Sequence, residues 1–114
     1  MKILKIKEPE YDPFLLSHFC PRETGLPMTV WVSVDDGKNN IHIKVDKTFG
    51  NKTIPDDVVF VALKPEIHII NGEINQENFK LVRNWIMLNF KIITDHWEGE
   101  IDTGGFVDNM RKII

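Results

Sequence analysis

Side chains able to do chemistry gather on one face of a predicted β-hairpin: Trp31, Ser33, His42 and Lys44. An imidazole exchanges protons near neutral pH, and an ammonium group stabilises a phosphate or a carboxylate. An indole ring can stack on a flat ligand or on a cation. These four residues form the candidate site for a partner or a ligand. The competing interpretation is a structural cross-strand pair of Trp31 with Lys44, beside a solvated histidine.

The hairpin that positions these residues is predicted by two segments, 28–34 and 41–46, in which apolar and polar residues alternate. A period of two is typical of strands that are buried on one face. A loop of six residues, rich in Asp, Asn and Gly, joins the segments. In the antiparallel register that closes on this loop, Trp31 lies opposite Lys44, and the other face of the hairpin is aliphatic.

Familiar catalytic and metal-binding patterns are missing from the sequence. The histidines do not have the spacing of a zinc motif, and Cys20 is the only cysteine. The tripeptide 102–104 matches the core of the aspartic-protease signature, but that fold needs a flap and a long return of strands, so we expect a chance match in a turn. His96 lies near the predicted end of a helix, where the helix dipole favours a cationic imidazole. We expect no catalytic residue, no metal and no cofactor.

Composition favours a single small cytoplasmic domain. The chain has 114 residues, of which 42% are hydrophobic, and a net charge of −3. This length suits one domain with one core, over residues 1–114. Charges of both signs are mixed along the sequence, which disfavours nucleic-acid binding. A lone cysteine fits a reducing cytoplasm. No apolar stretch approaches the ~18 residues of a membrane span, so we expect no membrane association.

One long helix is predicted over residues 75–98. Apolar residues recur there at intervals of three and four, which places them on one stripe of a helix: Phe79, Val82, Ile86, Phe90, Ile93 and Trp97. A second row widens the apolar arc: Leu81, Trp85, Leu88 and Ile92. Asn75 is a suitable N-cap, and Gly99 a suitable terminator. The width of the arc predicts that two layers cover this helix.

The remaining segments complete an α+β fold, a small antiparallel sheet of four to five strands packed against the long C-terminal helix. Residues 1–27 are expected to hold an edge strand at 1–7 and then an irregular arm with one helical turn. The sheet occupies residues 28–74, and its strand at 58–63 is apolar throughout, which is typical of a central strand. A further strand is expected at 66–70. The tail, residues 99–114, has helical spacing at its end and predicts a short terminal helix.

The chain resembles a family of small bacterial proteins catalogued as domain of unknown function 4160 and its near relatives. The segments that carry this resemblance are Thr24-Gly25-Leu26-Pro27, Trp31-Val32-Ser33, Ile43-Lys44-Val45, Gly72-Glu73, Trp85-Ile86-Met87-Leu88-Asn89 and Trp97-Glu98-Gly99-Glu100-Ile101-Asp102. The resemblance implies a small antiparallel sheet packed by a long helix, and it implies no activity because the family is uncharacterised. Many relatives carry a His-x-His pair in the second strand. Asn40-Ile41-His42 keeps only the second histidine.

Three functional hypotheses follow from these patterns. The first is a protein-interaction module of the antitoxin, immunity or mobile-element defence type, which needs only a stable fold and an exposed patch. The second is a small toxin-like or nucleic-acid-processing enzyme, with His42 as acid and base and Lys44 stabilising a phosphate. The third is a homodimer formed through a sheet edge or through the second apolar row of the helix.

Overall fold

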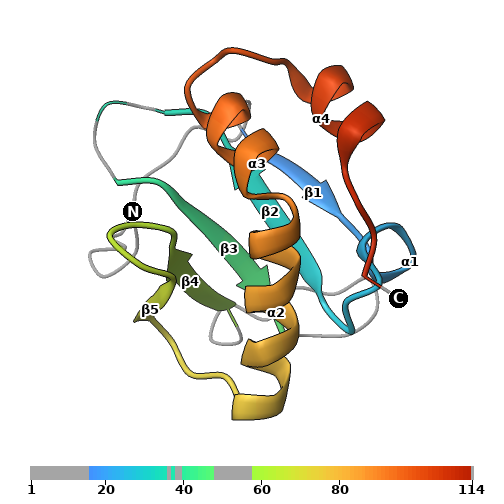
Figure 1. The fold of residues 1–114 in the computed structure, drawn as a ribbon. Helices are drawn as coiled ribbons and strands as arrows, with labels where there is room; N and C mark the ends of the chain where they lie inside the picture. Colours follow the sequence, from blue (N-terminus) through green and yellow to red (C-terminus); the bar gives the residue numbers. More distant parts are fainter. Residues whose placement is uncertain (1–15, 36, 38–39, 48–57, 114) are drawn as a thin grey trace, which may run out of the picture.

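Five antiparallel strands form one sheet in which each strand pairs with its neighbour in the sequence (Figure 1). The computed structural model describes residues 16–35, 37, 40–47 and 58–113, and the structural statements below concern those residues. The strands are β1 (Leu16–Phe19), β2 (Thr29–Ser33), β3 (His42–Asp46), β4 (Val58–Ala62) and β5 (His68–Asn71). The expected α+β class and the central place of the strand at 58–63 are confirmed.

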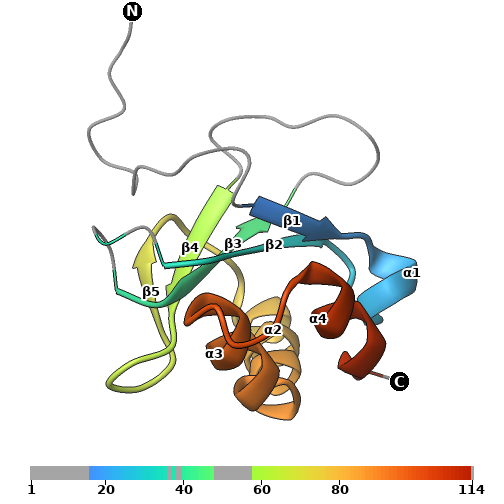
Figure 2. The same cartoon turned by 90° about the horizontal axis from the view of Figure 1, so that it is seen from above.

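The longer helices follow the sheet in the chain and lie on one of its faces (Figure 2). They are α2 (Gln76–Leu88), α3 (Phe90–Trp97) and α4 (Thr103–Asn109), whereas a single turn, α1 (Pro21–Thr24), joins β1 to β2. The side chain of Asn75 caps α2 by accepting a hydrogen bond from the amide of Asn78 at 2.7 Å. The predicted N-cap is therefore confirmed, because this acceptor satisfies one of the unpaired amides in the first turn.

The core lies between the sheet and α2 and α3. Val30 pairs with Val45, and Val45 pairs with Val59, so an aliphatic row crosses three strands on the face that the helices cover. These valines are fully buried, as are Trp85 and Ile86 of α2. Burial of several large apolar side chains supplies the main stabilisation, at roughly 1.5–3 kcal/mol for each side chain.

The long helix predicted over residues 75–98 is interrupted at Asn89, which separates α2 from α3. Asn89 has φ −112° and ψ 17°, outside helical values, and its side chain is buried. The side-chain Nδ2 of Asn89 donates to the main-chain carbonyls of Trp85 and Arg111, and its Oδ1 accepts from the main-chain amide of Arg111. The expectation of one continuous helix is therefore wrong at this residue. The backbone of Asn89 leaves helical geometry, and its buried side chain forms hydrogen bonds to the C-terminal segment.

The chain after α4 returns across the molecule to α1. The amide of Ile113 donates to the carbonyl of Thr24 at 2.7 Å, just before Gly25, which has φ +85°. A side chain on Gly25 would meet the carbonyl oxygen of Ile113. Together with the bonds from Asn89, this contact holds residues 110–113, here called the C-terminal strap, against the core.

Strand β1 falls in the segment that was expected to be irregular. It pairs with β2 over four residues and forms one edge of the sheet. Such a short segment contains little periodic signal, which explains why the sequence did not reveal it. The single helical turn expected in this region is confirmed by α1, whereas the strand expected at 1–7 lies outside the described residues.

Candidate functional site

A row of directly opposed residues crosses all five strands of the sheet. His18 lies opposite Trp31, Trp31 opposite Lys44, Lys44 opposite Phe60, and Phe60 opposite Asn71. The predicted register of Trp31 with Lys44 is therefore confirmed. Because side chains alternate between the two faces of a strand, this row projects from the face opposite the helices.

Trp31 is flanked in this row by two groups that can carry positive charge. The ammonium nitrogen of Lys44 lies 5.2 Å from the centroid of the indole ring, and the centroid of the His18 imidazole lies 4.8 Å from it, with the two ring planes at 36°. A cation near an indole face is attracted by the ring quadrupole, by about 0.5–1 kcal/mol at exposed sites. We name these three residues the tryptophan cluster.

The tryptophan cluster is partly open to solvent. His18 is exposed, whereas Trp31 and Lys44 are half-buried. The indole nitrogen of Trp31 is buried and has no hydrogen-bond partner in the described part of the protein. Solvent therefore does not reach the indole N–H. The cluster therefore presents aromatic carbon of the half-buried Trp31 and the exposed imidazole of His18.

Ser33 and His42, the other two residues of the predicted site, are buried. His42 is only 5% exposed. Its Nδ1 lies 2.7 Å from the carbonyl oxygen of Asn40, and its ring packs edge-on against Phe60 and Trp97, at centroid distances of 6.0 and 5.4 Å. The structure thus brings Trp31 together with Lys44, and it packs His42 into an aromatic environment that leaves little access for a substrate.

His18 is the member of the cluster that sequence reasoning missed. His18 lies beside Trp31 because β1 pairs with β2, and β1 was not predicted. The one available signal is the placement of Ser17 and His18 between Leu16 and Phe19. Four residues of mixed character are compatible with a strand but do not establish one.

A second polar cluster joins α3, α4 and β1. Nε2 of His96 lies 3.5 Å from Oγ1 of Thr103, which in turn lies 3.0 Å from Oγ of Ser17. His96 is 2% exposed, and its Nδ1 has no partner among the described residues. Burial lowers the pKa of His96, against weaker raising effects from the Ser33 backbone and from Asp102. The helix dipole was expected to favour the charged imidazole, but the pKa is lowered instead, because burial disfavours the charged form.

This buried imidazole predicts a pH dependence of stability. Because the pKa of His96 is lowered in the folded state, the unfolded chain binds a proton more readily once the pH falls to about 6.5. The contribution of neutral His96 to the free energy of unfolding is therefore complete above pH ~6.5. Below that pH it declines on acidification, by at most about 1.4 kcal/mol per pH unit. Chemical denaturation between pH 7.5 and pH 5 should show this decline, and His96→Leu should flatten it.

The matched control for that measurement is His68→Leu, since His68 is exposed. The pKa of Glu23 is also lowered, by the backbone amide and thiol of Cys20, but its ordinary value of 4.5 places that effect at a lower pH. If the decline in stability with falling pH persisted in His96→Leu and disappeared in His68→Leu, the pH dependence would belong to His68, and the prediction for His96 would be wrong.

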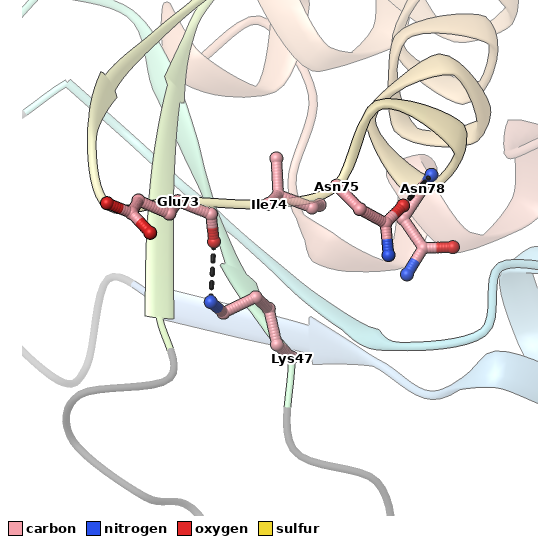
Figure 3. Close-up of a pocket in the computed structure, with 5 residues that line it drawn as sticks. All are labelled: Lys47, Glu73, Ile74, Asn75 and Asn78. Atoms are coloured by element: carbon pink, nitrogen blue, oxygen red, sulfur yellow. Dashed lines mark hydrogen bonds between the residues drawn. The ribbon is translucent and has the colours of Figure 1, made fainter.

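A shallow hollow of about 360 Å³ lies at the N-terminus of α2 (Figure 3). Its lining consists of Lys47, Glu73, Ile74, Asn75 and Asn78. Two hydrogen bonds lie within this lining: Nζ of Lys47 donates to the carbonyl of Glu73, and Oδ1 of Asn75 accepts from the amide of Asn78. Within the described residues, no three His, Cys, Asp or Glu side chains come together as a metal site requires.

No family model, curated protein or solved structure matched this chain. The helices in the part of the chain that the structure describes are too short or too polar to cross a membrane. Functional assignment therefore depends on the chemistry of the tryptophan cluster.

Proposed function

We propose that this protein is a small cytoplasmic interaction module that binds another protein through the tryptophan cluster. The observation that carries the proposal is the placement of Trp31 between Lys44 and His18 on the sheet face opposite the helices. Trp31 is half-buried, and tryptophan is one of the residue types enriched among the side chains that dominate binding energy in protein interfaces. A function of the antitoxin, immunity or mobile-element defence type needs only a stable fold and an exposed patch of this kind.

The partner surface that fits this cluster combines a flat apolar or aromatic group with a hydrogen-bonding group. The flat group would cover the exposed carbon of the Trp31 ring, and displacement of solvent from that ring would contribute to affinity. The hydrogen-bonding group would meet the exposed imidazole of His18.

Co-purification from the native host, followed by reconstitution with the purified partner, tests this proposal. We expect Trp31→Ala and Lys44→Glu each to weaken binding about 10–100-fold, as truncation of a central interface residue does. Lys80→Glu is the matched control, because Lys80 is exposed on α2, on the other side of the sheet. Equal binding by all four proteins would exclude the tryptophan cluster as the contact surface.

A further inference from the structure

Strand β5 is an edge strand with exposed apolar side chains. Among the strands that the structure describes, β5 pairs on one side only, with β4. Ile69 is 37% exposed and Ile70 is 50% exposed. The register shift between Phe60 and Val61 leaves Ile70 without a directly opposed residue on β4, because Phe60 lies opposite Asn71 and Val61 opposite Ile69. An edge of this composition lacks the lysines that commonly discourage further pairing.

Acidic residues flank this strand on both sides. Glu66 precedes β5 and Glu73 follows it, and both are exposed. A second copy that paired with β5 around a two-fold axis would bring Glu66 of one molecule toward Glu73 of the other, twice, and like charges disfavour that arrangement. A strand with positive charge at both ends would instead meet a carboxylate at each end, in either direction of pairing.

We propose that β5 accepts an additional strand from a protein partner whose segment is apolar in its centre and basic at both ends. Main-chain hydrogen bonds along the edge would supply affinity, and the apolar centre would cover Ile69 and Ile70. The two glutamates would select the charge of the segment. This surface is separate from the tryptophan cluster and does not depend on it.

Two blocked synthetic peptides test the proposal, acetyl-KTVTVTK-amide and acetyl-ETVTVTE-amide. Binding to the full chain is followed by chemical shifts of the backbone amides of β5. We expect the lysine peptide to bind at least about tenfold more tightly than the glutamate peptide. The double variant Glu66→Lys, Glu73→Lys should reverse this preference, which an effect on folding could not do.

Ile70→Lys introduces a charge on the edge and should weaken the lysine peptide about tenfold or more. Its control is Val107→Lys on α4, since Val107 is 49% exposed and Ile70 is 50% exposed. Equal affinity for the two peptides, or no shift at about 1 mM peptide, would overturn the proposal. A concentration-dependent dimer in sedimentation that Ile70→Lys abolishes would identify a second copy as the occupant and would also overturn it. Neither result bears on the tryptophan cluster, which is tested with its own variants.

Discussion

Gly25→Ala is expected to destabilise the protein by about 3 kcal/mol or more. Gly25 has φ +85°, a left-handed conformation that strains any residue with a β-carbon. An added β-carbon would also collide with the carbonyl oxygen and carbon of Ile113, both main-chain atoms that cannot rotate aside. The C-terminal strap would have to move, which breaks the hydrogen bond from Ile113 to Thr24. Thermal and chemical denaturation would measure the loss.

Gly99→Ala separates the two causes of that effect. Gly99 has φ +80°, nearly the same as Gly25, but a β-carbon there would meet no atom within 4 Å. The substitution therefore carries the conformational strain alone, about 1 kcal/mol. The difference between the two variants reports the collision with the strap. If both variants lost the same stability, the close approach of Ile113 to Gly25 would be refuted.

Asn89→Ala is expected to cost about 2–4 kcal/mol, because it removes three hydrogen bonds in a buried environment. The side chain of Asn89 donates to the carbonyls of Trp85 and Arg111 and accepts from the amide of Arg111. Its loss leaves main-chain groups of Arg111 without these partners. Hydrogen exchange should show faster exchange of the Arg111 amide, which a general loss of stability alone would not single out.

Two further substitutions give this prediction its controls. Asn84→Ala changes the same residue type at an exposed position of α2, and it should be neutral or slightly stabilising because alanine favours helix. Asn89→Asp keeps an acceptor for the Arg111 amide but removes both donated bonds, so it should also be destabilising. A stable Asn89→Asp protein would show that the donated bonds contribute little.

The sequence by itself determined the features that depend on periodicity. Alternation with a period of two placed β2 beside β3 and set Trp31 opposite Lys44, because a shift by one residue would have turned every valine away from the core. Spacing of three and four residues placed α2 and α3 within the predicted helical span. These signals are local, and each of them repeats over several residues.

Tertiary structure alone decided the features that depend on one contact between distant parts of the chain. Strand β1 exists because β2 pairs with it, and this pairing brought His18 to Trp31. The interruption at Asn89 exists because Arg111, far along the chain, offers both its amide and its carbonyl. Burial lowered the pKa of His96, whereas the helix dipole predicted that the charged imidazole would be favoured. Loss of hydration and hydrogen bonds between distant residues produce no periodic pattern in a sequence. These features therefore became visible only in the tertiary structure.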